Sequence, residues 1–217
     1  MKLISFTRNI DSGAIRGRLD VLKVILQVSD YLIDKQYSIC SNIENIEKNQ
    51  PFLYVDKMSR LFIPEKTGEV IPKIYSIVFP FSYNADQHVL SFNQININNS
   101  LNSCMKSIIS IFEGVLPETM EKILERCWEA CTDSELSKTQ SYDLIAVFTE
   151  LLTFDIGYVR YDYDEEHQNG VTHPLYHLDI NYSNQSTYKI GLKHSIDTLR
   201  FKAILDTKQE CWLLNAN

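Results

Sequence analysis

The sequence predicts an α+β fold with a mainly antiparallel sheet and a block of helices packed against it. Three observations lead to this prediction. Strand-like runs, many with apolar and polar residues alternating at a period of two, fall within residues 52–97 and 158–192. Between them, residues 100–154 repeat apolar side chains at a period of 3.6, as helices do. A length of 217 residues with 44% hydrophobic content suits a single domain over residues 1–217, with a lobe that carries a large insertion as the alternative.

The first element expected is a long amphipathic helix over residues 14–35. Its apolar residues recur at helical spacing, and Asp11 and Ser12 stand where a helix cap belongs. The helix should therefore bury one face.

Two hairpins are expected next. Residues 52–55 and 60–63 flank a short polar turn and predict the first hairpin, and residues 74–83 and 88–97 predict a second, stronger one. Pro80 lies inside the second pair. Since proline cannot donate to the hydrogen-bond ladder, it indicates an edge strand or a bulge.

Three helices should follow, over residues 101–112, 120–131 and 142–152. Thr132 and Glu135 have the spacing of a capping box and would begin the last helix. Near the C-terminus we expect a strand over residues 188–192 and an additional strand over 211–214. Between these strands, Ser195 would cap a helix over residues 196–205.

The chemically richest part of the chain is a hairpin formed by residues 158–164 and 175–182. Both runs alternate, so each would have one apolar and one polar face. A near-symmetric register places Asp162 opposite His177 and Arg160 opposite Asp179. Directly opposed side chains have Cβ atoms about 4.5–5.5 Å apart, close enough for ionic hydrogen bonds.

This polar face can be interpreted in two ways, and the residues involved are Arg160, Asp162, Asp164, His173, His177 and Asp179. In the functional interpretation, Asp162, Asp164, His173 and His177 bind a divalent metal, and Arg160, Asp162, His177 and Asp179 act in catalysis. In the structural interpretation, ion pairs pin the hairpin: Arg160 neutralises Asp179, and Asp162 orients His177. Beyond this divalent metal, the sequence implies no cofactor.

The composition of the chain limits the kinds of molecule that it is expected to bind. The net charge is −7, which disfavours capture of nucleic acid or an anionic membrane surface and leaves a protein partner as the main expectation; a local basic patch would still permit nucleic-acid binding. Five cysteines, an odd number, argue against a disulfide framework and for a reducing cytoplasm. No apolar run has the roughly 20 residues of a membrane span. The oligomeric state is not indicated.

Most enzyme templates do not match. The chain has no phosphate-binding loop, no dinucleotide-binding turn, no nucleophile elbow and no zinc-protease or zinc-deaminase signature. A metal-dependent nuclease remains an alternative, with Asp162, Asp164 and Asp179 as metal ligands and Lys189 or Arg160 as the cation. The strand of Lys189 lacks the acidic residue two places earlier that the common nuclease pattern has.

The run Tyr158-Val-Arg-Tyr-Asp-Tyr-Asp164 followed by His173-Pro-Leu-Tyr-His-Leu178 resembles a bacterial domain family of unknown function. The resemblance covers Arg160, Asp162, Asp164, His173 and His177 and ends there, because residues 181–193 lack the family's Arg-Ile-Pro run. It implies a phage-defence or toxin–antitoxin setting. We therefore expect an accessory protein that acts by binding, with a metal-dependent hydrolase such as a nuclease as the alternative.

Overall fold

The protein is described by a computed structural model covering residues 2–11, 13–46, 50–55, 59–67, 70–112, 115–183, 187–211 and 213. Within this part of the chain it has five α-helices, an eight-stranded antiparallel sheet and a small three-stranded sheet, which confirms the α+β prediction. The chain divides into two compact units. The first comprises residues 1–8, 38–78 and 157–217, and the second residues 9–37 and 79–156. That the two form one domain stays a prediction.

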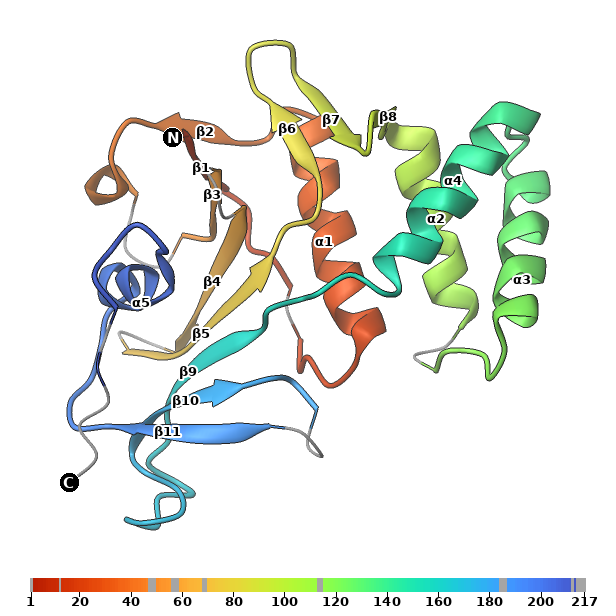
Figure 1. Cartoon of the computed structure of the whole chain (residues 1–217). Coiled ribbons are helices and arrows are strands. Elements are labelled where there is room, and N and C mark those ends of the chain that lie inside the picture. Colours follow the sequence, from red (N-terminus) through yellow and green to blue (C-terminus); the bar gives the residue numbers. More distant parts are fainter. Residues whose placement is uncertain are drawn as a thin grey trace. The chain divides into compact units, whose positions relative to one another are not determined.

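The first unit is built on the large sheet (Figure 1). Its strands run in the order β11-β10-β9-β5-β4-β3-β1-β2, and every neighbouring pair is antiparallel. The strands are β1 (Lys2–Ser5), β2 (Ser38–Cys40), β3 (Phe52–Val55), β4 (Arg60–Thr67), β5 (Val70–Val78), β9 (Val159–Tyr163), β10 (Tyr176–Ile180) and β11 (Tyr188–Leu192). A short 3-10 turn, Ile43–Asn45, follows β2.

One face of this sheet carries the apolar core of the first unit. Helix α5 (Thr198–Leu205) places the fully buried Phe201 on it, edge-to-face with Phe62, which in turn stacks on Phe52 at 4.8 Å between ring centroids. Such aromatic pairs add to the free energy gained from burial. The helix begins after Asp197, whose side chain accepts a hydrogen bond from the Arg200 amide, so the predicted cap at Ser195 is wrong.

The opposite face changes character along the sheet. On β3, β4 and β5 it presents buried apolar residues, among them Leu53, Leu61 and Ile77. On β9, β10 and β11 it presents charged residues and a histidine instead. The polar cluster therefore lies on the sheet face opposite α5.

The second unit contains four helices and the small sheet. The helices are α1 (Arg18–Ile33), α2 (Asn99–Ile111), α3 (Met120–Asp133) and α4 (Lys138–Leu151), and the strands are β6 (Ser82–Asn84), β7 (Val89–Phe92) and β8 (Ile95–Asn96). Helix α2 packs against α1, α3 and α4. Cys127 and Cys131 are buried in this bundle as small core residues. None of the helices described here is long and apolar enough to cross a membrane.

Several sequence predictions need correction. The second predicted hairpin is confirmed only next to its turn, where β6 pairs with β7; its first run is not one long strand of that hairpin, because β5 pairs with β4 and β9 instead. Pro80 lies between β5 and β6, outside any strand, where its missing N–H costs no ladder bond.

The predicted capping box is also misplaced. Thr132 is inside α3, and the box that begins α4 is Ser137 with Gln140. Helix α1 begins later than predicted, after Gly17. The first hairpin is confirmed, since β3 pairs with β4. Strands β1 and β2 were not predicted.

Some predictions fall on positions outside the described residues. These are the cap at Ser12, most of the turn between β3 and β4, and two of the four residues of the C-terminal strand expected over 211–214.

Candidate functional site

The polar face predicted for the hairpin exists in the predicted register. Asp162 on β9 pairs with His177 on β10, and Arg160 pairs with Asp179. All four side chains project from the face opposite α5, because residues that alternate with them, such as Tyr161, belong to the apolar core. The alternation of the two strands therefore fixes the site.

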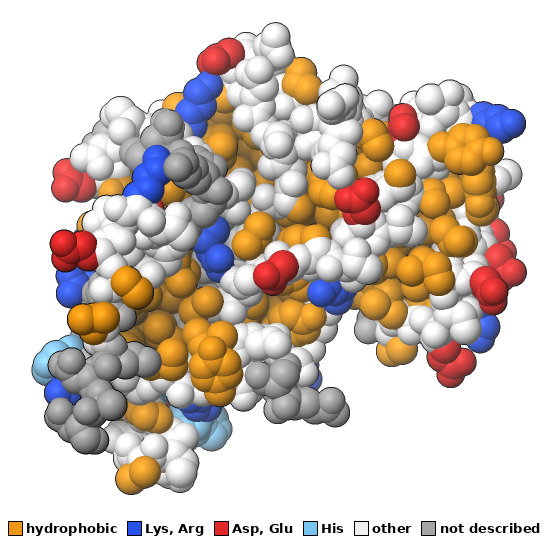
Figure 2. Space-filling model, viewed as in Figure 1, with side chains coloured by type: hydrophobic (Ala, Val, Ile, Leu, Met, Phe, Trp, Pro, Cys, Tyr) orange, Lys and Arg blue, Asp and Glu red, His pale blue; other side chains and the backbone are white. Residues whose placement is uncertain are grey.

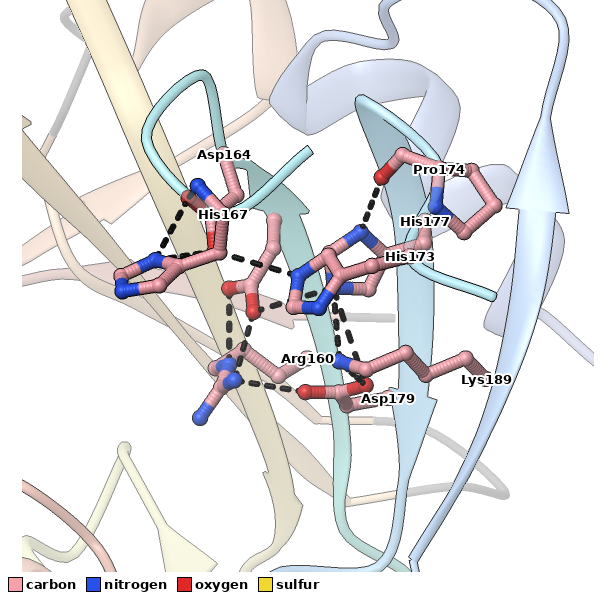
Figure 3. A network of polar contacts seen from close by, with 9 residues as sticks. Arg160, Asp164, His167, His173, Pro174, His177, Asp179 and Lys189 are labelled. Carbon is pink, nitrogen blue, oxygen red and sulfur yellow. Dashed lines mark hydrogen bonds and ion pairs between the residues drawn. The ribbon is translucent and has the colours of Figure 1, made fainter. Parts of the chain in front are cut away.

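Arg160 joins the two carboxylates (Figure 3). Its Nε donates to Oδ1 of Asp162 at 2.7 Å, and its Nη2 donates to Oδ2 of Asp162 at 2.5 Å and to Oδ2 of Asp179 at 2.6 Å. Only 5% of the Asp162 side chain and 7% of the Asp179 side chain are exposed. The two-point contact with Asp162 is the geometry in which guanidinium–carboxylate pairs are strongest.

Lys189 on β11 completes the network from the other side. Its Nζ donates to Oδ1 of Asp179 at 2.7 Å and lies 2.9 Å from Nε2 of His177. The β10–β11 register places Lys189 directly opposite Asp179. Three neighbouring strands thus contribute charged groups to one cluster.

His177 is fully buried and held by its other nitrogen. Nδ1 lies 2.8 Å from the backbone oxygen of Pro174, and since a carbonyl only accepts, Nδ1 must carry a proton. Nε2 then faces both Lys189 and Oδ2 of Asp162, which is 3.4 Å away. The ring orientation is therefore fixed by the loop that precedes β10.

Gly191 lets that loop come close. A Cβ at Gly191 would lie 2.9 Å from Cγ of Pro174, nearer than packed atoms approach. Gly191 stands opposite His177 in the β10–β11 pair. The missing side chain on β11 therefore makes room for Pro174, and through it orients the histidine.

The cluster is electrically neutral as a whole. Asp162 and Asp179 are two negative charges, and Arg160 supplies one positive charge. Since Nε2 of His177 and Nζ of Lys189 are 2.9 Å apart, one proton serves this contact: an ammonium donates to a neutral imidazole, or an imidazolium stands beside a neutral amine. Either arrangement adds one positive charge, so the four charges cancel.

The ion pair between Asp162 and Arg160 shifts the pKa of both residues. Burial raises the pKa of Asp162, but its contacts with His177 and Arg160 outweigh burial and hold that pKa below the usual range. Burial lowers the pKa of Arg160, and the hydrogen bonds and charges of Asp162 and Asp179 reverse this effect and raise it. Both residues therefore stay charged throughout the physiological range.

Three of the predicted residues have ligand atoms close enough for one metal ion. One atom each from Asp162, His177 and Asp179 lies within 4.8 Å of the others, and all three residues are buried. The donor set, two carboxylates and an imidazole, suits a divalent transition metal. However, Nζ of Lys189 lies within hydrogen-bond distance of two of these ligands, so a metal would have to displace this nitrogen.

The other two predicted ligands belong to a neighbouring cluster. Asp164 accepts a hydrogen bond from the amide of His167, and Nδ1 of His167 lies 3.1 Å from Oδ1 of Asp164. Nε2 of His173 lies 3.2 Å from Oδ2 of Asp164, but it makes no well-directed hydrogen bond and is shielded from solvent. Burial raises the pKa of Asp164, and its contacts with His167 and His173 lower it overall. Asp164 and His173 thus lie outside the group that could share one ion, although the rings of His173 and His177 meet edge-to-face at 4.8 Å between centroids.

Sequence reasoning missed part of the network. The sequence suggests Lys189 only as the cation of a nuclease. Its contact with His177 follows from the register between β10 and β11, and the prediction of a strand over residues 188–192 does not give that register. His167 was not considered at all. The glycine in β11 was the available signal for close packing, because glycine within a strand often marks the approach of another backbone or ring.

Comparison with known proteins identifies no relative: no family model, no curated protein and no solved structure matches the chain.

Proposed function

We propose that the protein acts by binding a protein partner and that the polar network is the structural centre of β9, β10 and β11. The network supports this interpretation because its charges are satisfied internally. Arg160 and Lys189 bond to the same carboxylates that a reaction or a metal would need. A buried group whose bonds are all made is a poor acid, base or ligand until another group leaves.

The observation that carries the proposal is an exposed aromatic pair on the helices. Trp128 on α3 and Tyr142 on α4 are 42% and 56% exposed, and their rings meet edge-to-face at 5.5 Å. Met120, at the start of α3, is also exposed. Tryptophan and tyrosine are the side chains that most often dominate binding energy at protein interfaces. We call the surface formed by Trp128 and Tyr142 the aromatic surface.

Charge around the aromatic surface indicates the kind of partner. Residues 118–155 contain nine acidic side chains and three basic ones, a large share of the net charge of −7. In Figure 2, orange apolar side chains and red acidic side chains are exposed over the region of α3 and α4. A partner with basic residues around an apolar centre would complement this surface, and opposite charge would speed association.

The biological setting we propose is a bacterial phage-defence or toxin–antitoxin complex. It rests on the resemblance of the segments Tyr158–Asp164 and His173–Leu178 to the family described above. The products of genes next to the coding gene are then the first candidate partners.

The test is coexpression with the products of neighbouring genes, followed by size-exclusion chromatography of the purified complex. Trp128→Ala combined with Tyr142→Ala should weaken the complex at least tenfold while the chain still unfolds in one cooperative transition, because neither side chain belongs to the buried core. The control is Ile39→Ala, another exposed apolar residue, on β2. A complex that survives the double substitution as well as it survives the control would contradict the proposal.

A second candidate is a metal-dependent hydrolase, with a nuclease as the specific case. It is favoured by the proximity of Asp162, His177 and Asp179, and by the bond from Nδ1 of His177 to a backbone oxygen, which is how metal-binding histidines are commonly oriented. Arg160 would then stabilise negative charge on a phosphate. In that case Mn²⁺ should raise the unfolding temperature of the wild type but not of Asp162→Asn, and RNA or DNA should be cleaved by the wild type but not by His177→Ala. If the first candidate holds, Mn²⁺ leaves both unfolding temperatures unchanged and neither nucleic acid is cleaved.

A further inference from the structure

Strand β11 ends the large sheet. It pairs with β10 along all five of its residues, and in the described part of the chain no strand pairs with its other side (Figure 1). The outer N–H and C=O groups of such a strand form a template for another strand. The opposite edge of the sheet, β2, is only three residues long.

The usual protection of an edge strand is weak in β11. The strand has no proline, its pairing with β10 shows no register shift, and its one charged residue, Lys189, is bonded to Asp179 and His177. Tyr188, Ile190 and Leu192 point to the apolar face of the sheet, and Tyr188 is 60% exposed. Natural edge strands commonly use a free lysine, a proline or a bulge to prevent further pairing.

We propose that β11 pairs with β11 of a second copy, antiparallel and centred on Ile190, to form one continuous sheet across two chains. The apolar faces of both copies lie on one side of the joined sheet only if the two-fold axis passes through a residue and not between two residues. Opposed residues of an antiparallel pair share a face, and an axis through a residue places apolar residues opposite apolar ones. The central candidates are therefore Lys189, Ile190 and Gly191.

Charge selects among these three registers. Centring on Lys189 places the two copies of Lys189 opposite each other, and centring on Gly191 places Lys189 opposite Lys193. Like charges in opposed positions destabilise a sheet. Centring on Ile190 places Lys189 opposite the glycine of the other copy, and Tyr188 opposite Leu192. This register has no charge conflict and joins apolar side chains on one face, so the sequence of β11 is complementary to itself.

Self-association is more favourable through the β11 edge than through the aromatic surface. Self-association through residues 118–155 would bring nine acidic side chains of each copy together, whereas β11 has no net repulsion in the register described. A two-fold axis is also the commonest symmetry of protein oligomers. The inference is independent of the proposed partner, because the two surfaces belong to different compact units.

The experiment uses the full chain with Cys211→Ser, which removes an exposed thiol. The register predicts that Ile190→Cys forms a disulfide-linked dimer under mild oxidation, because opposed Cα atoms lie about 4.5–5.5 Å apart. Tyr188→Cys alone should not link to itself, since its copies would be four residues apart along the strand, about 13 Å. A mixture of Tyr188→Cys and Leu192→Cys chains should yield the mixed dimer.

Light scattering gives the second readout. At about 100 µM, the wild type should show twice the 25.2 kDa mass of the chain, and Tyr188→Lys should show the single mass with the circular dichroism spectrum of the wild type. A monomeric wild type at this concentration would overturn the proposal. So would a dimer that Tyr188→Lys leaves intact, or one in which Tyr188→Cys links to itself as readily as Ile190→Cys does.

Discussion

Replacing Asp162 by asparagine tests whether the polar network holds β9, β10 and β11 together. The substitution keeps the shape of the side chain, but it removes the charge that receives two hydrogen bonds from Arg160 and places an amide group beside donors. Removing one partner of a buried ion pair costs about 3–5 kcal/mol in the free energy of unfolding. Because 24% of the Arg160 side chain is exposed and Arg160 keeps its bond to Asp179, the cost should be near the lower limit.

We therefore expect Asp162→Asn to lower the free energy of unfolding by about 3 kcal/mol. For a chain of 217 residues this corresponds to a decrease in unfolding temperature of about 6–12 °C. Urea unfolding followed by circular dichroism at pH 7 measures the first quantity, and a thermal scan measures the second.

The matched control is Asp164→Asn, one step further along the same face. Asp164 has no guanidinium partner: it contacts His167, whose side chain is 65% exposed, and His173, whose side chain is 25% exposed, so its replacement should cost about 1 kcal/mol. Equal effects of the two substitutions would refute the claim that the network around Asp162 stabilises the sheet.

The effect of Asp162→Asn should depend on pH. The pKa of Asp162 is lower in the folded protein than in the unfolded chain, so its carboxylate contributes stability above the unfolded value of about 4, and this contribution is lost as the pH falls through the folded pKa. The difference between wild type and Asp162→Asn should be constant above about pH 5 and should shrink below about pH 4. The lowered pKa of Asp206 affects both proteins alike and cancels in this difference.

Three further substitutions or reactions probe the same structure. Gly191→Ala should lower the free energy of unfolding by about 1–3 kcal/mol through the contact with Pro174, and Pro174→Ala in the same chain should restore part of the loss, as urea unfolding would show. Lys189→Met should cost about 1–3 kcal/mol by leaving Asp179 and His177 without this donor, and Mn²⁺ should then raise the unfolding temperature of this variant in a thermal scan while leaving the wild type unchanged. Burial raises the pKa of the Cys127 thiol to about 12, so mass spectrometry after iodoacetamide treatment at pH 8 should find Cys127 modified only in urea.

The site was largely predictable from sequence because it depends on local alternation. Each of the two strands had an apolar set that could face only the core, so the polar residues had to share the other face, and the register placed Arg160 opposite Asp179 as expected. Two of the four predicted metal ligands, Asp164 and His173, lie outside the group around Asp162 and His177. Both are at the loop end of the hairpin, where strand alternation no longer fixes the direction of a side chain.

The pairing of the other strands was harder to predict, because some partners are far apart in the sequence. Strand β5 was assigned to a hairpin with the segment that follows it, although it pairs with β9, more than 80 residues later in the chain. Neither strand carries a signal for that choice, since both are apolar on one face. Local signals also misled where two positions offered similar chemistry: Thr132 with Glu135 and Ser137 with Gln140 both have capping-box spacing, but only Ser137 follows the end of α3.

The central claim is that Arg160 and Lys189 neutralise the two buried carboxylates and leave no place for a metal. Amide NMR signals recorded during a titration with Mn²⁺ test it residue by residue, because the paramagnetic ion broadens the signals of nearby nuclei. The account predicts that the signals of Asp162, His177 and Asp179 keep their width at one equivalent of Mn²⁺. Broadening centred on these three residues, which also weakens the signals of their neighbours on β9, β10 and β11 and is absent in Asp162→Asn, would contradict it.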